Sequence, residues 1–217
     1  PGNRIVTLAD AAYPQALLAQ TRLDSVTLRR SEDAFVDELF AGMAALGAPL
    51  LSAQFPRALI DVNRGMAELD RAMFDGALNM KVDTPSPRVA AGLGVIPRIV
   101  RDGAEIYSRK LDSAEVHTRL EQLYKPYHAA LAGLMDETHA RFGVAVLIDC
   151  HSMPSALAVP DIVLGDRYGA SAAPALSARA ETAFLREGFP VTRNTPYAGG
   201  HTTVLYGKAA DGCHALQ

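Results

Sequence analysis

The sequence has few cysteines, no long hydrophobic run and no excess of positive charge. Two cysteines in 217 residues cannot form a disulfide framework, and their scarcity favours a reducing compartment. The longest apolar runs, such as residues 144–148, are far shorter than the ~20 residues that span a bilayer. A net charge of −3 provides no attraction for nucleic acids or anionic membranes. The first ten residues contain no apolar segment typical of a secretory signal. We therefore expect a cytoplasmic protein with a small-molecule partner, no nucleic-acid partner and no membrane partner.

Several common catalytic motifs are also missing. The sequence contains no Gly-x-Ser-x-Gly, the turn that exposes the nucleophile of many serine hydrolases. It has no Walker loop for nucleotide phosphates. The segment Gly-Leu-Gly-Val-Ile-Pro at 92–97 lacks the third glycine and the preceding strand of a dinucleotide-binding loop. These observations argue against a serine hydrolase, a nucleotide-binding protein with a Walker loop and a dinucleotide-binding enzyme.

The composition, 49% hydrophobic and 21% charged, is typical of a globular protein. Helical patterns alternate with short β-branched runs, which predicts an α/β fold of a single domain over residues 1–217. The clearest helix is expected over residues 31–47, with Ser31 as N-cap, Glu32 and Asp33 complementing the helix dipole, and Gly47 at the end. Its apolar face is expected to contain Phe35, Val36, Leu39, Phe40 and Met43. Strands are expected at residues 49–53 and 58–62.

The second half predicts a long helix over residues 113–142, with a break at Pro126 because proline lacks the amide hydrogen of a helix interior. Residues 144–149 read as a central strand buried on both faces. A helix over residues 174–187 then leads to a strand at 190–193, and a crossover helix of this kind implies a parallel strand pair. His117, His128 and His139 recur every eleven residues, too far apart along a helix for one metal ion, and predict a solvated helix face.

The segment Ile-Asp-Cys-His-Ser-Met-Pro-Ser at 148–155 is the strongest candidate for chemistry. Asp149 and His151 are two residues apart and project to the same side of a strand end, where a carboxylate can orient a metal-binding histidine. The alternative is a hydrogen-bonded histidine that closes the strand. Cys150 points the opposite way, which favours a buried, inert thiol over a nucleophile.

The segment Asp-Val-Asn-Arg at 61–64 follows an expected strand. A guanidinium beside an amide side chain suits a carboxylate, which it binds through two parallel hydrogen bonds. The alternative is an ordinary turn with a surface salt bridge.

Taken in order, these segments resemble the N-formylglutamate amidohydrolase family. The family is related to zinc carboxypeptidases and to aspartoacylase-like amidases, so the resemblance implies a phosphorylase/hydrolase-like three-layer α/β/α sandwich with a mixed, largely parallel central sheet. It also implies hydrolysis of N-formyl-L-glutamate to L-glutamate and formate, a late step in histidine degradation. The matching stretches are LRRSEDAFVDELF (28–40), FPRALIDVNR (55–64), GLGVIPRI (92–99), LIDCHSMPS (147–155), VLGDRYGAS (163–171) and NTPYAGGHTT (194–203).

The resemblance assigns roles to single residues. It implies that Asp33 and His151 are ligands of a zinc ion, that Asn63 and Arg64 hold a substrate carboxylate, and that Arg57 polarises the scissile carbonyl. The remaining candidates for substrate binding are Arg98, Arg193, Asn194 and Tyr197.

The sequence departs from the family pattern in two places. The family has a metal-binding histidine shortly before its Tyr-Pro, whereas no histidine precedes His117 here. The family also continues beyond residue 217 into a segment with the glutamate general base, so we expect the natural chain to be longer. Three alternatives stay open: a related metallo-amidase or carboxypeptidase for another N-acyl amino acid, a non-catalytic carboxylate-binding descendant, and a thiol hydrolase that uses Cys150.

Overall fold

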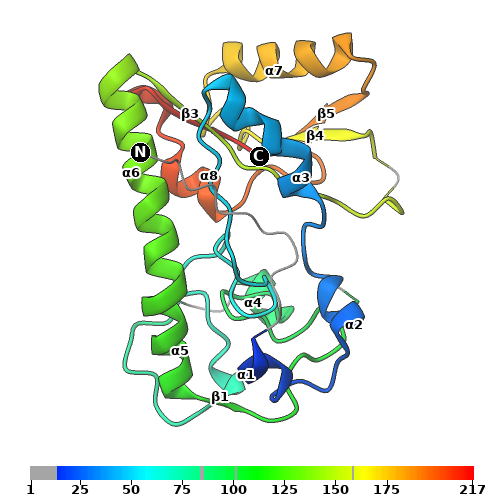
Figure 1. Cartoon of the computed structure of the whole chain (residues 1–217), viewed down its shortest axis with the longest axis vertical. Helices are drawn as coiled ribbons and strands as arrows, with labels where there is room; N and C mark the ends of the chain where they lie inside the picture. Colours follow the sequence, from blue (N-terminus) through cyan, green and yellow to red (C-terminus); the bar gives the residue numbers. More distant parts are fainter. Residues whose placement is uncertain (1–13, 84–85, 101, 158) are drawn as a thin grey trace. The chain divides into compact units, whose positions relative to one another are not determined.

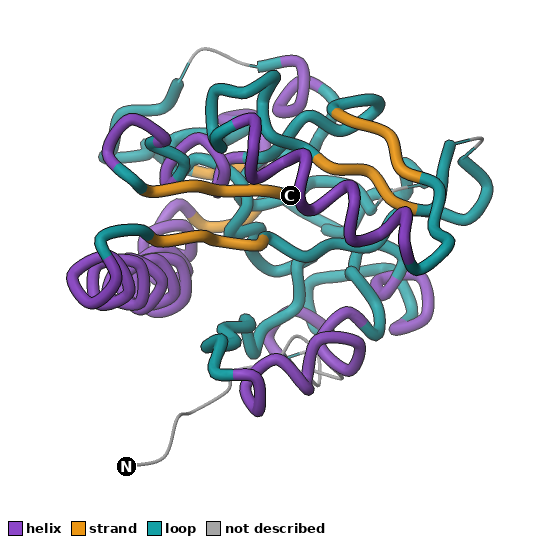
Figure 2. The backbone as a smooth tube through the Cα atoms, turned by 90° about the horizontal axis from the view of Figure 1, so that it is seen from above, coloured by secondary structure: helices purple, strands orange, loops and turns teal. Residues whose placement is uncertain are grey.

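The computed structural model describes residues 14–83, 86–100, 102–157 and 159–217. The chain forms two compact units, residues 1–129 and 130–217. The predicted α/β class is confirmed, since helices and short parallel strand pairs occur together (Figures 1 and 2). The three-layer sandwich with one central sheet stays a prediction, as does the single domain. Within the described residues, no helix is both long and apolar enough to cross a bilayer.

The first unit is built from short helices, connecting loops and one parallel strand pair. Its apolar core includes Ile60, Val95 and Leu120 in one cluster and Leu28 and Ile106 in another. Its elements are α1 (Gln15–Leu18), α2 (Ser25–Arg29), α3 (Val36–Phe40), η1 (Ala41–Leu46), η2 (Arg71–Met73), β1 (Phe74–Asp75), α4 (Pro87–Ala90), β2 (Leu111–Asp112), α5 (Ser113–Arg119), η3 (Leu120–Tyr124) and the beginning of α6 (Lys125–Phe142).

The second unit contains two parallel strand pairs. β3 pairs with β6, and β4 pairs with β5 across the crossover helix α7. The expected helix at 174–187 and strand at 190–193 are therefore confirmed, and the helix does connect two parallel strands. The strand at 190–193 pairs with β4, however, which the sequence did not predict, and not with the strand expected at 144–149. The elements are the rest of α6, β3 (Ala145–Ile148), β4 (Ile162–Leu164), α7 (Pro174–Arg186), β5 (Val191–Arg193), α8 (His201–Tyr206), η4 (Ala209–Asp211) and β6 (Cys213–Leu216).

The helix predicted over residues 31–47 begins later than expected. Gly47 ends the helical stretch at φ 83°, as predicted, but Phe35 has φ 65° and α3 starts only at Val36. The predicted apolar face is wrong in part: Val36, Phe40 and Met43 are half-buried, but Phe35 and Leu39 are exposed and Asp37 is buried. The acidic residues before Phe35 are engaged in contacts with residues 57 and 58, and these tertiary contacts replace the expected helix start.

The strands predicted at 49–53 and 58–62 do not form; the first contains one isolated bridge residue, Leu51, and the second is a buried turn. Leu59 and Ile60 both donate their amides to the Pro56 carbonyl, which bends the chain where an extended strand was expected. A short apolar run is ambiguous between strand and buried turn.

The helix over residues 113–142 is unbroken at Pro126 (Figure 1). The preceding residues form a π-helical turn, η3, which ends one residue before α6 begins at Lys125. A π turn shifts the hydrogen-bond ladder by one residue, so the missing amide of Pro126 interrupts the helix less than a proline in a regular helix would.

Two further expectations are wrong. β3 is exposed on one face, since Val146 and Ile148 are 41% and 52% exposed. His128 is not solvated like the highly exposed His117: its ring lies 4.3 Å from that of Tyr124 and its Nε2 donates to the Val62 carbonyl at 3.0 Å.

Candidate functional site

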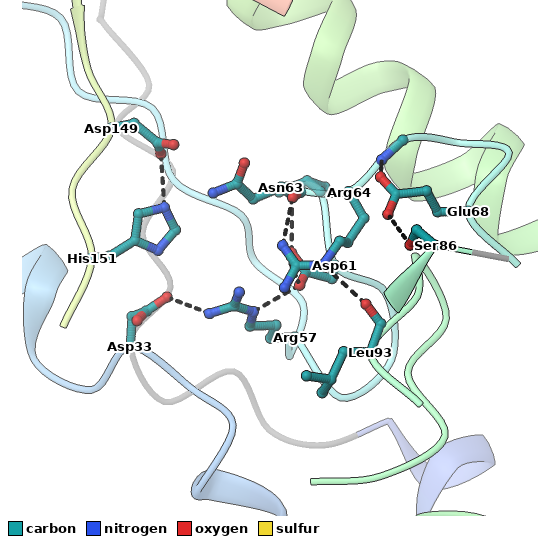
Figure 3. A network of polar contacts seen from close by, with 12 residues as sticks. Asp33, Arg57, Asp61, Asn63, Arg64, Glu68, Ser86, Leu93, Asp149 and His151 are labelled. Carbon is teal, nitrogen blue, oxygen red and sulfur yellow. Dashed lines mark hydrogen bonds and ion pairs between the residues drawn. The ribbon is translucent and has the colours of Figure 1, made fainter. Parts of the chain in front are cut away.

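A buried carboxylate lies between two arginines in the first unit (Figure 3). Asp61 Oδ2 is 3.0 Å from Arg57 Nε and 3.6 Å from Arg64 Nη1. Asp61 is 7% exposed, and the Arg57 and Arg64 side chains are 26% and 12% exposed. The two guanidinium groups are therefore held close together by one carboxylate.

The backbone of residues 56–64 explains this geometry. After the Pro56 turn, the Asp61 amide donates to the Val95 carbonyl at 2.8 Å. Asp61 Oδ1 then accepts the Asn63 amide at 2.9 Å, and its carbonyl accepts the Arg64 amide. An aspartate that binds the backbone two residues on forms an Asx turn. One side chain thus shapes the turn and pairs with the arginines.

The charges of this cluster stabilise one another. Burial disfavours the charged form of Asp61, but the neighbouring Arg57 and Arg64 outweigh it and lower the pKa of the carboxyl. Asp61 and then Asp33 raise the pKa of Arg57, despite its burial. Burial lowers the pKa of Arg64. The attraction between Asp61 and the two arginines thus favours the charged form of each group.

Asp33, the predicted metal ligand of the first unit, contacts the opposite side of Arg57. Its Oδ2 accepts from Arg57 Nη1 at 3.0 Å (Figure 3). The neighbouring Glu32 accepts the backbone amides of Arg57 and Ala58 at 2.9 and 3.3 Å. Burial raises the pKa of Glu32 against these hydrogen bonds. Asp33 and Glu32 thereby fix both the side chain and the backbone of Arg57.

Arg64 is oriented by backbone carbonyl groups. Its Nε donates to the Leu93 carbonyl at 3.0 Å and its Nη1 to the Asn63 carbonyl at 2.7 Å (Figure 3). The Tyr124 hydroxyl donates to the Arg64 carbonyl at 2.8 Å. Gly94 lies in the same glycine-rich loop as Leu93 and allows this loop to pack closely against the backbone of Glu68, since a Cβ at Gly94 would lie 2.5 Å from the Glu68 carbonyl oxygen. The loop at 92–97 thus fixes the orientation of the Arg64 side chain through the Leu93 carbonyl.

The predicted strand-end pair is present in the second unit. His151 Nε2 lies 3.1 Å from Asp149 Oδ1 (Figure 3), as the two-residue spacing predicts. A carboxylate that accepts one ring N–H is the usual partner of a metal-ligating histidine. Burial, and then the charge of Asp149, raise the pKa of the Cys150 thiol to about 12, so the thiol is protonated at neutral pH and is a poor nucleophile.

The remaining candidates have partners of their own. Arg98 lies 3.4 Å from Asp70 and 3.3 Å from Glu105, and Arg193 pairs with Glu181. Asn194 is buried and binds Asp166. Tyr197 is 38% exposed. Their predicted part in substrate binding stays a prediction.

The donor types of Asp33 and His151 suit zinc, which takes carboxylate oxygen and imidazole nitrogen. Between residues 14 and 217, leaving out positions 84, 85, 101 and 158, no group of three His, Cys, Asp or Glu side chains is placed to hold a metal ion. The family position for a further histidine falls before Tyr13, outside the described residues. The described chain therefore offers suitable ligands but no complete set.

Two residues of the site have contacts that were not predicted from the sequence, Asp61 with both arginines and Glu32 with the backbone of residues 57 and 58. In the sequence, Asp61 only begins the segment at 61–64, and Glu32 is expected only to complement a helix dipole. A signal existed for Asp61, because an aspartate side chain readily accepts the backbone amide two residues on and so favours a turn. Nothing near Glu32 in the sequence indicates its contact with residues 57 and 58.

Comparison with known proteins gives a consistent result. Residues 9–217 match the family model described as N-formylglutamate amidohydrolase. The chain is 30% identical to an N-formylglutamate deformylase of Pseudomonas aeruginosa, over all of this chain and 76% of that protein. It is also 30% identical to an N-formylglutamate deformylase of Pseudomonas putida, over 85% of this chain and 67% of the relative.

A solved structure is similar as well. The crystal structure of an N-formylglutamate amidohydrolase from Ralstonia eutropha JMP134 superposes with a TM-score of 0.87 and 32% sequence identity. The match covers all of this chain and 78% of that one.

Proposed function

The chain belongs to the N-formylglutamate amidohydrolase family, and we propose on that premise that it hydrolyses the formamide bond of N-formyl-L-glutamate to give L-glutamate and formate. Two relatives at 30% identity are named N-formylglutamate deformylase, which supports this activity. We propose further that the reaction belongs to histidine degradation, as the family resemblance implies, and that the protein is cytoplasmic, which the scarcity of cysteine supports.

The arginine pair around Asp61 is the observation that carries the proposal. An acidic N-formyl amino acid presents carboxylates, and guanidinium groups bind carboxylates through paired hydrogen bonds. Arg64 has its Nε and Nη1 bound to carbonyl oxygens, so its plane is set before substrate binds. Preorganisation of this kind reduces the entropy lost on binding.

Arg57 is suited to stabilise the charge that develops on the substrate carbonyl oxygen. Its Nε and Nη1 bind Asp61 and Asp33, which leaves three of its five N–H donors for other acceptors. One well-placed donor to such an oxygen contributes roughly 3 kcal/mol to transition-state stabilisation. Asp61 and Asp33 keep Arg57 charged and fixed in direction, so it needs little reorganisation during the reaction.

We also propose that the enzyme is zinc-dependent, with Asp33 and His151 as ligands. When bound, zinc supplies an activated water and polarises the carbonyl. Asp149 would orient the His151 ring through the hydrogen bond at Nε2, and in a neutral ring with its proton there Nδ1 carries the lone pair. The donor types of the two residues support this assignment.

Replacement of Arg64 tests the substrate-binding role. We expect Arg64→Ala to raise KM for N-formylglutamate by about 10- to 100-fold, since a hydrogen bond to a charged group is worth about 1.5–3 kcal/mol. Arg64→Lys should recover only part of the affinity because lysine lacks the paired donors. Steady-state kinetics with N-formyl-, N-acetyl- and N-succinylglutamate measure both this and the preferred acyl group.

Arg30→Ala is the matched control, because Arg30 belongs to the same unit but is 53% exposed. Unchanged kinetics in Arg64→Ala would contradict the substrate-binding role. A wild-type enzyme that turned over only the acetyl or succinyl compound would contradict the proposed deformylation.

A further inference from the structure

The carboxyl ends of four strands meet in the second unit. Asp149, after β3, donates its amide to Leu216 O of β6 at 2.7 Å. Gly165, after β4, donates to Gln217 O at 2.8 Å, and Asn194, after β5, donates to Leu164 O at 2.9 Å. Ligands of open α/β folds bind beyond the carboxyl ends of strands, so side chains that follow these strands are candidates for ligand contact.

The loop after β4 holds two side chains in an unfavourable backbone conformation. Arg167 and Tyr168 have φ of 54° and 58° and precede Gly169 at 85°. Left-handed backbone disfavours residues that carry a Cβ, and consecutive examples persist only where their surroundings enforce them. Such positions cluster at ligand-binding sites.

A buried polar network enforces this conformation. Asn194 Oδ1 accepts the amides of Asp166 and Tyr168 at 3.0 and 3.3 Å, and its Nδ2 donates to Asp166 Oδ1 at 2.8 Å. The Ser177 hydroxyl donates to Asp166 Oδ2 at 2.7 Å, and the Gly169 amide donates to Asp166 Oδ1 at 3.0 Å. The hydrogen bonds from Ser177 and Asn194 lower the pKa of Asp166 against its burial. The network thus holds the loop in one shape.

Arg167 presents its charge from this rigid loop. Its amide donates to the Ala198 carbonyl at 2.8 Å, and its Cγ would lie 3.1 Å from a Cβ on Gly199, so glycine there makes room for the side chain. Arg167 is exposed, and within the described part of the chain its guanidinium has no ion pair or hydrogen bond. Arg98 and Arg193, in contrast, are paired with carboxylates.

We propose that Arg167 is a specificity-determining residue that binds one carboxylate of the acidic N-formyl amino acid. This inference rests on the proposed deformylase function. A substrate with two carboxylates requires more than one cationic contact, and Arg167 combines a free guanidinium with a fixed backbone. The Asp166–Asn194 network positions the backbone of Arg167.

The test compares Arg167→Ala, Arg167→Gly and the control Arg186→Ala, which removes an exposed arginine from the last turn of α7. Kinetics are measured with N-formylglutamate and its two monoamides, N-formylglutamine and N-formylisoglutamine. We expect both Arg167 variants to raise KM for N-formylglutamate about 10- to 100-fold with little change in kcat. For the monoamide that lacks the recognised carboxylate, the variants and the wild type should have the same KM.

A thermal melt separates binding from folding. Arg167→Gly relieves the left-handed strain, so its Tm should equal or exceed that of the wild type while the KM defect remains. An unchanged KM for N-formylglutamate, an equal KM defect with both monoamides, or a lowered Tm in the glycine variant would overturn the proposal. Failure of the wild type to release formate from N-formylglutamate would instead overturn the proposed function.

Discussion

At the scale of single residues, Asp61 connects the two arginines of the candidate site in the first unit. It faces Arg57 and Arg64 and also shapes the backbone turn. Asp61→Asn would leave two half-buried guanidinium groups without their shared, buried carboxylate. Loss of one partner from a buried ion pair costs about 3–5 kcal/mol, so we expect a decrease of this size in the free energy of unfolding, measured by urea denaturation at pH 7.

The same residue predicts an acid-sensitive stability. The pKa of Asp61 is lowered in the folded state, so its contribution is fully present above the unfolded-state pKa of about 3.9 and is lost as the pH falls through the lower folded-state value. In Asp61→Asn this part of the acid transition should be absent. The control Asp102→Asn removes a 53% exposed carboxylate and should cost under about 1 kcal/mol. If Asp61→Asn and Asp102→Asn lost the same free energy of unfolding, the stabilising role of Asp61 would be contradicted.

Two glycines illustrate how position decides the effect of one methyl group. A Cβ at Gly165 would lie 2.7 Å from the backbone carbon of Ala198, whereas a Cβ at Gly133 in α6 meets nothing within 4 Å. We expect Gly165→Ala to lower the free energy of unfolding by about 1–3 kcal/mol through overpacking. Gly133→Ala should raise it by up to about 1 kcal/mol, because alanine favours the helix.

Both glycine variants can be measured by chemical denaturation. A stabilised Gly165→Ala variant would show that the contact with Ala198 is not tight.

At the scale of elements, the start of α3 is set by Phe35. This residue is 62% exposed and has φ 65°, a conformation that costs a residue with a Cβ about 1–2 kcal/mol. Phe35→Gly should therefore raise Tm. Phe142→Gly is the matched control: Phe142 is 63% exposed at the end of α6, and glycine there should lower Tm because it disfavours the helix.

Opposite signs for these two phenylalanine variants are the expected result. A lowered Tm in both would mean that the Phe35 ring stabilises the protein more than its backbone strain destabilises it.

The elements also separate local from tertiary causes. The end of the helical stretch at Gly47 and the helix α7 were predicted because the residues that determine them are adjacent in sequence. The start at residue 31 was wrong because Glu32 and Asp33 bind residues 57 and 58 instead of capping a helix. Pro126 was expected to break its helix, but the π turn before it accommodates the proline.

At the scale of the whole molecule, the proposed metal chemistry and the alternative thiol chemistry predict opposite responses to two reagents. A chelator should abolish formate release and added zinc should restore it. Alkylation at pH 7.5 should leave activity unchanged, because a pKa of about 12 keeps the Cys150 thiol protonated.

His151→Ala should lower the zinc content of the purified protein, measured by elemental analysis, with Cys150→Ser as the control that keeps zinc and activity. Undiminished zinc in His151→Ala would remove this residue from the ligand set. Inactivation by alkylation without an effect of the chelator would favour the thiol mechanism.

The α/β class and the family could be predicted without the structure, because contiguous segments such as those at 55–64 and 147–155 carry the family pattern. The sequence also predicted the pairing of Asp149 with His151, whose contact depends only on a two-residue spacing. Only the tertiary structure showed that Asp61 joins Arg57 to Arg64 and that the Asp166–Asn194 network shapes the loop of Arg167. The Asp166–Asn194 contact joins residues 28 positions apart, which no local pattern specifies. The pairing of Asp61 with both arginines depends on a turn whose backbone is held by the distant Val95 carbonyl.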